Sequence, residues 1–351
     1  METKRIRITD KSKIDDRELS EAARILIEGG LVAFPTETVY GLGANALDEE
    51  AAKKIYAAKG RPSDNPLIAH IAGMEGLRPL VADVPAVAEK LAEAFWPGPL
   101  TMVFNKSDKV PYGTTGGLET VAVRMPSDPV ASRLIQLAGV PVAAPSANTS
   151  GRPSPTLADH VWEDMNGKID LLIDGGAVGI GLESTIVDVS GEVPVLLRPG
   201  AVTVEMLEET VGSIELDPAI TGRPDAGVKP KAPGMKYRHY APQARLLLVQ
   251  GEPDAVTGAI NRLVQEQEDH GLRAGIICTE ETRDRYQAGI IRCIGSREQE
   301  ETIAHNLFAV LREFDSQQVD VIYSESFSAD HLGQAIMNRL MKAAGYHVIR
   351  V

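Results

Sequence analysis

Short apolar runs alternate with segments of helical periodicity along almost the whole chain. In the second half, for example, the runs Leu246–Val249 and Ala274–Cys278 flank Asp254–Glu268, whose apolar residues recur at helical spacing. Such runs have the length of buried strands, and strands that alternate with helices form parallel sheets with helices on their faces. The sequence therefore predicts an α/β protein.

The predicted elements fall into two parts of the chain. In the first part we predict strands at 5–9, 31–34, 67–71, 100–104, 119–126, 140–144 and 170–173, a hairpin at 185–189 and 193–197, and helices at 16–28, 49–58, 84–95, 128–138 and 157–165. In the second part we predict strands at 246–249, 274–278, 289–293 and 319–323 and helices at 254–268, 298–314 and 333–344. Glycines predict connections at 35–43 and 113–117.

A proline-rich segment separates the two parts. From Gly212 to Pro242 five prolines punctuate the chain and no apolar periodicity remains, which is typical of an interdomain linker. Because 351 residues fit two domains better than one, we predict domains at 1–211 and 243–351 and a linker at 212–242. The linker ends in a basic and aromatic cluster, which suggests that it packs on an anionic group such as a bound nucleotide. The cluster consists of Lys229, Lys231, Lys236, Tyr237, Arg238, His239 and Tyr240.

The charge and the cysteines exclude several classes of protein. The net charge of -13 argues against an extended nucleic-acid groove, which needs clustered cations, although a local basic patch remains open. The segment Met1–Lys13 is charged throughout, and no apolar run reaches the length of a membrane span. Cys278 and Cys293 lack metal-ligand spacing and are predicted to be buried free thiols. We expect a soluble cytoplasmic protein without a membrane segment.

Polar residues crowd connections that follow predicted strands in the first part. The loop Pro145–Pro155 carries three serines, a threonine, an asparagine and an arginine between three prolines and a glycine. Taken alone it fits an ordinary surface loop as well as a polar-ligand site. The segment Pro35–Gly43 brings hydroxyls, a carboxylate and glycines to the end of a strand, where open α/β sheets bind ligands. A plain connection into the next helix is its alternative interpretation.

Other charged and polar positions also allow two interpretations. Lys59 and Arg61 flank a glycine ahead of two prolines, where they are better placed to meet an anion than to pair on a helix surface; solvated charges are the alternative. His70 lies within a predicted strand and, taken alone, indicates a satisfied core residue. In the second part, 324–331 fits either a binding loop or a solvated loop; we favour the solvated loop and identify no catalytic set.

Taken together, the polar clusters of the first part predict one cleft. They fall at or near the ends of predicted strands, at Thr36, Lys59 with Arg61, Arg124, Ser146 with Asn148, and Ser184 with Arg198. The set is rich in cations and hydroxyls, and it shows no evident pair of protein nucleophile and base. It therefore predicts a site that positions reactants and neutralises phosphate charge, with help from a bound divalent cation.

Seven segments of the first part resemble one family. They are Pro35–Gly43, Lys59–Leu67, Trp96–Pro99, Ala122–Pro126, Pro145–Asn148, Glu183–Thr185 and Leu197–Gly200. Together, in this order and spacing, they resemble the L-threonylcarbamoyladenylate synthases. The segment Pro233–Pro242 and the second α/β part resemble the longer, two-domain members. The resemblance implies a YrdC-like twisted open α/β sheet domain plus a smaller Rossmann-like parallel α/β domain.

The resemblance also implies a reaction and its residues. L-threonine, bicarbonate and ATP would give threonylcarbamoyl-AMP and pyrophosphate, and the product would pass to the machinery that modifies tRNA beside the anticodon. By motif position, Lys59 and Arg61 would be catalytic. The threonine side would be lined by Thr36, His70, Arg124, Ala144 and Ser184. The ATP side would comprise Lys59, Arg61, Ser63, Thr120, Ser146, Asn148, Ser154, Arg198 and Tyr240. Mg²⁺ would bind through the ATP phosphates, with no protein side chain as its ligand.

Two other functions stay open at this point. The YrdC-like fold is also associated with double-stranded RNA, so an RNA-binding module is one alternative, and the acidic balance speaks against it. A related carbamoyl-transfer enzyme is the other, although such proteins carry zinc-finger cysteines that this chain lacks. Direct RNA binding and the role of the second domain are left open.

Overall fold

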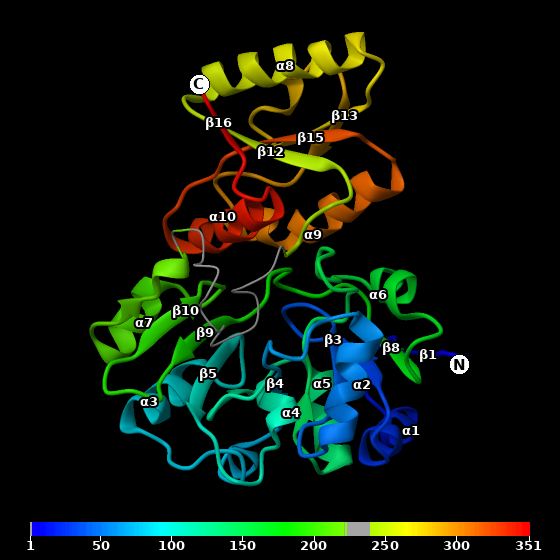
Figure 1. Ribbon diagram of the computed structural model, residues 1–351, viewed down its shortest axis with the longest axis vertical. Helices are drawn as coiled ribbons and strands as arrows, with labels where there is room; N and C mark the ends of the chain where they lie inside the picture. The colour runs from blue at the N-terminus through cyan, green and yellow to red at the C-terminus, as the bar shows by residue number, and fades with distance from the viewer. Residues whose placement is uncertain (1, 221, 223–238) are drawn as a thin grey trace. The chain divides into compact units, whose positions relative to one another are not determined.

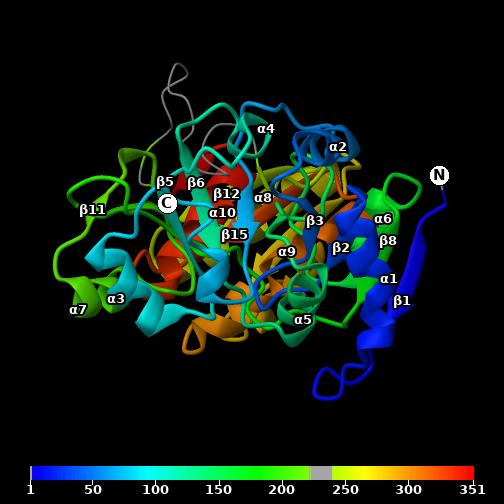
Figure 2. The ribbon, with the colours of Figure 1, turned by 90° about the horizontal axis from the view of Figure 1, so that it is seen from below.

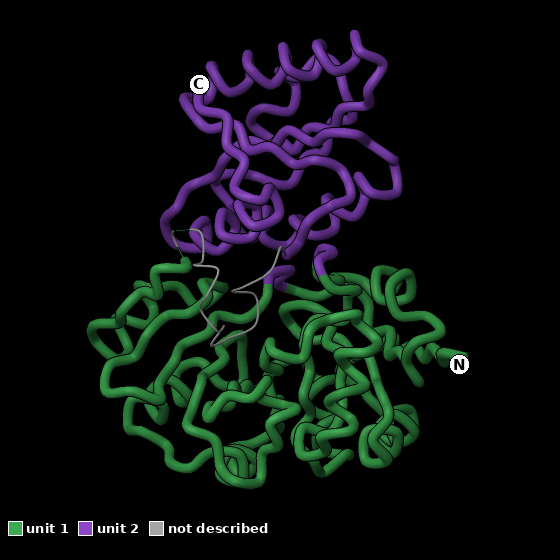
Figure 3. The backbone as a smooth tube through the Cα atoms, in the orientation of Figure 1, with its two compact units in different colours: residues 1–150, 154–179, 183–237 green, residues 151–153, 180–182, 238–351 purple. Residues whose placement is uncertain are grey.

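The computed structural model describes residues 2–220, 222 and 239–351. The chain forms two compact units, one of residues 1–150, 154–179 and 183–237, and one of residues 151–153, 180–182 and 238–351 (Figure 3). Two short segments of the first half thus group with the second unit. We describe each unit by itself.

The first unit is built on one mixed sheet, with the strand order β1-β8-β2-β3-β7-β4-β6-β5-β9-β10-β11 among the described residues. The strands are β1 (Lys4–Arg7), β2 (Val32–Phe34), β3 (Gly41–Asn45), β4 (Ile68–His70), β5 (Leu100–Asn105), β6 (Thr120–Arg124), β7 (Val142–Ala143), β8 (Leu171–Asp174), β9 (Thr185–Asp188), β10 (Val195–Arg198) and β11 (Glu215–Leu216). The predicted hairpin is confirmed, because β9 and β10 pair antiparallel.

Helices cover both faces of this sheet. They are α1 (Asp16–Ile27), α2 (Glu49–Lys59), α3 (Ala86–Phe95), α4 (Tyr112–Thr115), α5 (Pro129–Ala138), α6 (Ala158–Met165) and α7 (Val204–Val211), with single 3₁₀ turns at Met74–Gly76 and Pro218–Ile220. Local signals set several of their ends. Asp15 and Glu18 form a capping box at the start of α1, and Gly60 takes a left-handed conformation after α2.

The core lies in two apolar layers on either side of the sheet. Val32 and Phe34 of β2 point into the layer shared with α1 and α5, whereas Ala33 points into the layer that contains α2, α3 and α6. This alternation follows from the two-residue period of a strand. The view from below in Figure 2 shows α1 and α5 on one side of the sheet and α2 on the other.

Two predicted connections of this unit were partly wrong. Residues 41–45 form strand β3, which pairs antiparallel with β2, so the chain turns back into the sheet before helix α2 begins. Gly43 suits this position because a Cβ there would lie 2.7 Å from the Phe34 ring and 2.8 Å from Val142. In the segment 113–117, residues 112–115 form the short helix α4. Helix α7 was not predicted.

The second unit is a parallel sheet with helices on both faces, as predicted. Its strands are β12 (Arg245–Gln250), β13 (Ala274–Cys278), β14 (Ile290–Cys293), β15 (Val321–Glu325) and β16 (Val348–Arg350), in the order β14-β13-β15-β12-β16. Helix α8 (Pro253–Asp269) covers one face, and α9 (Glu300–Ser316) and α10 (His331–Ala343) cover the other (Figure 1). A 3₁₀ turn lies at Arg283–Arg285. Strand β16 was not predicted.

The predicted linker lies mostly outside the described residues. Its first part contains β11 and the turn at Pro218–Ile220, and Lys229, Lys231, Lys236, Tyr237 and Arg238 of its basic and aromatic cluster fall in the undescribed range. No helix in the described parts of the chain combines the length and the apolar character that a membrane span requires.

Candidate active site

Arg124 ends strand β6 and its side chain is enclosed by groups from two loops. The residue is 4% exposed. Its Nε donates a hydrogen bond to the Gly98 carbonyl at 3.3 Å, and its Nη1 donates to the Thr38 hydroxyl at 2.9 Å. Its Nη2 lies 2.6 Å from Oε1 of Glu37. The guanidinium is therefore a fixed, buried positive charge in the first unit.

Glu37 is the anionic partner of this arginine. Its side chain is 14% exposed, and burial alone would raise the pKa of its carboxyl group. The positive charge of Arg124 acts in the opposite direction and prevails, so the pKa of Glu37 lies below its ordinary value. At neutral pH the pair is a buried carboxylate against a buried guanidinium.

His70 lies beside this pair and is uncharged at neutral pH. It stands opposite Arg124 in the parallel register of β4 and β6 and is 3% exposed. Its Nδ1 lies 3.1 Å from the Ile68 carbonyl, and its ring meets the Phe34 ring edge-on. Burial, and then the charge of Arg124, lower the pKa of His70 to about 3. The histidine can therefore shape the site without adding a second positive charge.

Hydroxyl groups surround the same region. The Thr36 hydroxyl donates to the Val39 carbonyl at 2.6 Å and lies 2.9 Å from the Thr38 hydroxyl. The Ser184 hydroxyl lies 2.8 Å from the hydroxyl of Thr101, a residue that stands opposite Arg124 in the register of β5 and β6. Contacts and strand register thus connect Thr36, His70, Arg124 and Ser184, which were predicted to line one side of the cleft.

Arg198 was predicted on the nucleotide side, and the structure places it against Ser184. Its Nε donates to the Ser184 carbonyl at 3.0 Å, and its Nη2 donates to the Ser184 hydroxyl at 3.2 Å. The arginine is 5% exposed. A second buried cation therefore lies beside the hydroxyl groups of the threonine side.

Lys59 holds the loop that follows β7. Its Nζ donates to the carbonyl oxygen of Ser146 and, at 2.6 Å, to that of Asn148. The Ser146 hydroxyl in turn donates to Oδ1 of Asn148 at 2.5 Å. Residue Lys59 is 3% exposed, and its own carbonyl accepts a hydrogen bond from the Ser150 amide at 2.9 Å. The structure thus joins Lys59, Ser146 and Asn148 in one buried, positively charged turn.

Arg61 is positioned by the loop that leads into β4. Its Nη2 donates to the carbonyl oxygens of Asn65 and Pro66, both at 3.1 Å, and its guanidinium lies over the Tyr56 ring at 5.8 Å. The Asn65 carbonyl also accepts the Tyr56 hydroxyl at 3.0 Å. These contacts hold the guanidinium between the loop and the Tyr56 ring of α2, and its contact with an anion stays a prediction.

The remaining predicted residues have different environments. Ser63 is exposed and Thr120 is half-buried at the start of β6. Ala144 is buried and its amide donates to the Ile68 carbonyl at 2.9 Å. The Ser154 hydroxyl donates to the Glu183 carboxylate. Tyr240 belongs to the second unit, where its ring stacks on Phe308 at 5.1 Å, so its contact with a nucleotide stays a prediction.

Sequence reasoning gave no role to several residues of this region. They are Glu37, Thr38, Gly98, Thr101 and Glu183. A signal for Glu37 exists in the sequence: an arginine at the end of a buried strand needs an anionic partner, and Glu37 stands between two threonines at the end of another buried strand. Thr101 lacks such a signal, because it lies inside an ordinary apolar strand.

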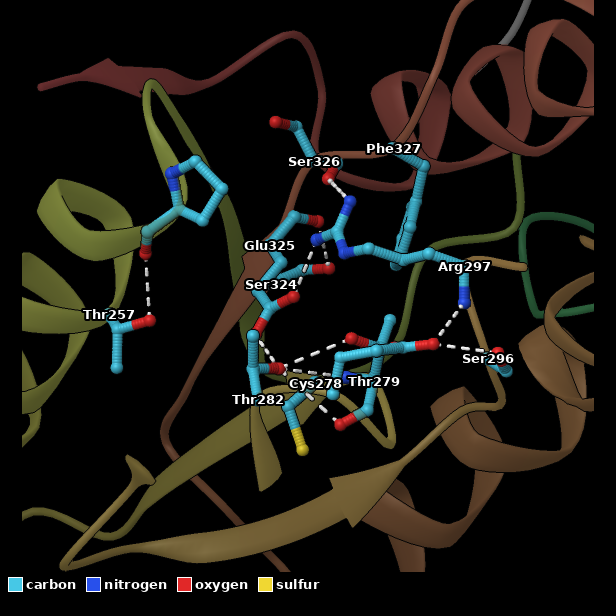
Figure 4. Close-up of polar contacts among 12 residues, drawn as sticks. Thr257, Cys278, Thr279, Thr282, Ser296, Arg297, Ser324, Glu325, Ser326 and Phe327 are labelled. Carbon is cyan, nitrogen blue, oxygen red and sulfur yellow. Dashed lines mark hydrogen bonds and ion pairs between the residues drawn. The ribbon is translucent and has the colours of Figure 1, made fainter. Parts of the chain in front are cut away.

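The second unit contains a buried polar cluster of its own, at the carboxyl ends of β13 and β15 (Figure 4). Glu325 is 1% exposed and accepts the hydroxyls of Thr282 and Tyr286, at 2.5 and 2.6 Å, and Nη2 of Arg297 at 2.6 Å. Our interpretation of 324–331 as a solvated loop is therefore wrong for Ser324 and Glu325, which are buried. Protein donors already engage both carboxylate oxygens of Glu325, so this cluster is structural.

The described residues contain no group of three or more His, Cys, Asp or Glu side chains placed to hold a metal ion. The cationic and hydroxyl groups of the first unit are of a different kind. They suit carboxylate and phosphate ligands, which accept hydrogen bonds and carry negative charge.

Fold and site together define an α/β protein whose buried cations and hydroxyls suit anionic ligands. Comparison with known proteins identifies the family. Residues 24–200 match the family described as telomere recombination, and residues 202–345 match the family described as threonylcarbamoyl-AMP synthase, C-terminal domain.

Full-length relatives carry the same name. The chain is 49% identical over 353 residues to the threonylcarbamoyl-AMP synthase of Bacillus subtilis, with all of both chains covered. It is 50% identical over 344 residues to that of Pyrococcus abyssi, with 98% of this chain and 99% of the relative covered. The crystal structure of P. abyssi Sua5 complexed with L-threonine aligns with a TM-score of 0.94 at 49% identity, covering 99% of this chain and 100% of that one.

The chain therefore belongs to the threonylcarbamoyl-AMP synthase family. The α/β fold with a second parallel-sheet domain, the resemblance and the predicted activity, an ATP-dependent synthesis of threonylcarbamoyl-AMP, are confirmed. An enzyme is thus the right class, rather than an RNA-binding module.

Proposed function

We propose that Arg124 binds the carboxylate of L-threonine and that the turn held by Lys59 binds ATP. The observation that carries the first assignment is the burial of the Arg124 guanidinium beside the hydroxyl group of Thr38 and near those of Thr36 and Ser184. A buried arginine recognises a carboxylate strongly, because its planar donors match the two oxygens. The relative from P. abyssi was solved in complex with L-threonine, which supports an amino-acid site in this fold.

The other residues of the threonine side complete the proposed pocket. Thr36 and Ser184 offer hydroxyl groups that can hydrogen-bond the polar groups of the substrate, and the neutral His70 and the small Ala144 form its walls. Arg198, held on Ser184, provides a positive charge close to the position where the two substrates meet. This arrangement orients L-threonine and leaves the chemistry to the substrate's own nitrogen.

On the nucleotide side, Lys59 and Arg61 would stabilise phosphate charge, together with Ser146 and Asn148. Lys59 orders the 146–148 turn by donating to two of its carbonyl oxygens, and its ammonium group places a buried positive charge there that would attract phosphate. Ser63, Thr120, Ser154 and Tyr240 would add contacts to ATP, as the family resemblance implies. Their roles stay predictions.

The reaction balances without a protein nucleophile. The threonine amine adds to bicarbonate, or to the carbon dioxide formed from it, giving a carbamate with loss of water or of a proton. A carbamate oxygen then attacks the α-phosphorus of ATP, and the bond to the β-phosphate oxygen breaks to release pyrophosphate. The chain's own residues hold the carboxylate of threonine, neutralise phosphate charge and keep the reacting groups in line.

Mg²⁺ would bind to the phosphate oxygens of ATP rather than to protein side chains. The donor groups described above are cations and hydroxyls, and Mg²⁺ takes phosphate oxygens and water readily. When bound, it neutralises charge on the departing pyrophosphate. The further partners follow from the product: a tRNA-modifying machinery would consume it, in the cytoplasm.

The proposed function is tested by following pyrophosphate release and threonylcarbamoyl-AMP by mass spectrometry. The protein is incubated with ATP, L-threonine, bicarbonate and Mg²⁺, and each component is omitted in turn. We expect pyrophosphate to appear only with the full set, together with the product. Pyrophosphate or AMP formed at the same rate without threonine would refute the proposal.

A further inference from the structure

The guanidinium of Arg124, which we propose binds the threonine carboxylate, already contacts a carboxylate of this chain. Nη2 of Arg124 lies 2.6 Å from Oε1 of Glu37, and Nη1 and Nε are held by Thr38 and Gly98. Glu37 comes from the loop after β2, and Arg124 ends β6, so the fold brings the two charges together from distant parts of the sequence.

Charge neutralisation alone leaves part of Glu37 unexplained. A counter-ion for a buried arginine is usually hydrogen-bonded through both oxygens, because each unpaired oxygen costs desolvation free energy. Here the two carboxylate oxygens of Glu37 are buried, and neither accepts a well-aligned hydrogen bond from a described residue, although the Arg124 guanidinium and the backbone amides of Glu37 and Ser127 lie near enough to lower the pKa of the carboxyl group. A carboxylate held in this way retains the capacity to accept a donor from a ligand.

The substrate supplies such a donor at the right place. L-threonine carries a carboxylate and an amino group on neighbouring carbon atoms, so its two charges lie side by side. The protein presents a guanidinium and a carboxylate that also lie side by side and are buried together. An amino acid whose carboxylate meets Arg124 therefore brings its nitrogen next to Glu37.

We propose that Glu37 accepts a hydrogen bond from the threonine nitrogen and so selects an α-amino acid and orients the nitrogen that becomes carbamoylated. This inference rests on the proposed function, because it assumes that Arg124 binds the substrate carboxylate. Glu37 accepts from the ammonium group when the amino acid arrives and from the amine when it reacts. Two other roles for Glu37 make different predictions: it could compete with the substrate carboxylate for Arg124, or it could serve the fold alone.

The test compares two ligands that differ in one group. L-threonine has the amino group, and (R)-3-hydroxybutanoate lacks it but keeps the carboxylate and the hydroxyl. Their affinities for the wild-type protein and for Glu37→Gln are measured by chemical-shift titration, without ATP. Glu37→Gln keeps the size of the side chain and removes its charge. Thr38→Val serves as the matched control, because it removes a neutral partner of Arg124 from the neighbouring position.

We expect Glu37→Gln to lower the affinity for L-threonine by about ten- to a hundredfold, which corresponds to the loss of one hydrogen bond to a charged group. The same change should leave (R)-3-hydroxybutanoate unchanged or make it bind more tightly, because Arg124 then lacks its internal anion. Thr38→Val should affect both ligands alike. Glu37→Asp, which keeps the charge on a shorter side chain, should recover part of the threonine affinity.

Two results would overturn the inference. Tighter L-threonine binding by Glu37→Gln would show that Glu37 competes for Arg124, and equal weakening of both ligands would assign it to the fold. Arg124→Ala separates this inference from the proposed function. If Arg124→Ala abolishes binding of both ligands while Glu37→Gln changes the two affinities equally, the role proposed for Glu37 is wrong and the threonine pocket at Arg124 is supported. If Arg124→Ala changes neither affinity, the pocket itself is wrong.

Discussion

Replacing Lys59 by methionine should disable ATP use while sparing threonine binding. Methionine is unbranched and similar in length, but it cannot donate a hydrogen bond. The substitution would leave the carbonyl oxygens of Ser146 and Asn148 without the buried ammonium that now joins them. The turn that we assign to the nucleotide would therefore lose its main support.

The size of the effect follows from these two contacts. An unsatisfied buried acceptor costs about 1–3 kcal/mol, so two of them cost about 2–6 kcal/mol. At about 1.4 kcal/mol per tenfold, the smallest value corresponds to a loss of about thirtyfold. We therefore expect Lys59→Met to lower kcat/KM for ATP by at least about thirtyfold, while the affinity for L-threonine, measured without ATP, changes by less than about threefold.

The chain offers a matched control on the same helix. Lys54 of α2 also donates its Nζ to one backbone carbonyl, that of Gly29 at 2.7 Å, and it lies away from the 146–148 turn. Lys54→Met should leave kcat/KM for ATP and the affinity for L-threonine close to the wild-type values. The assay is steady-state pyrophosphate release with ATP varied at saturating threonine. An unchanged kcat/KM for ATP in Lys59→Met, or an equal loss in Lys54→Met, would refute the role of Lys59.

Two further predictions concern stability. Gly43→Ala should lower the free energy of unfolding by about 1–3 kcal/mol, because the new methyl group would overlap Phe34 and Val142. The control Gly258→Ala, at an exposed position of α8 with open space around it, should leave the free energy of unfolding unchanged or raise it by up to about 1 kcal/mol. Urea unfolding measures both variants, and equal effects would contradict the packing of β3. His70 should make the protein less stable as pH falls from about 6.5 toward 3, because the unfolded chain binds a proton that the folded imidazole, with its pKa of about 3, does not. This costs about 2 kcal/mol at pH 5 relative to pH 7. His70→Gln should remove that part of the pH dependence, and identical profiles for both proteins would disprove the assignment.

The sequence predicted the elements well wherever local signals were strong. The apolar spacing of 16–28 and the glycine pair after it predicted helix α1 within one residue of its observed end, and the alternation in the second half predicted its parallel sheet. These features depend on periodicity and capping, which are local properties of the chain.

The errors came from long-range pairing. Glycines at 41 and 43 indicated a connection, but β3 forms because its small residues fit between Phe34 and the neighbouring strand β7. That contact joins residues about a hundred positions apart and leaves no periodic trace in the sequence. The site shows the same limit: Lys59, Arg124, Ser146 and Asn148 could be named from their motifs, whereas the contacts of Lys59 with the 146–148 turn and of Arg124 with Glu37 follow from the folded arrangement.

The most direct test of the account is a crystal structure with L-threonine and a non-hydrolysable ATP analogue bound together. We predict that the threonine carboxylate contacts Arg124 and its nitrogen faces Glu37, while the nucleotide phosphates contact the 146–148 turn and Arg61. A threonine bound away from Arg124, or phosphates bound away from that turn, would contradict the central claim that the first unit holds both substrates on these buried cations.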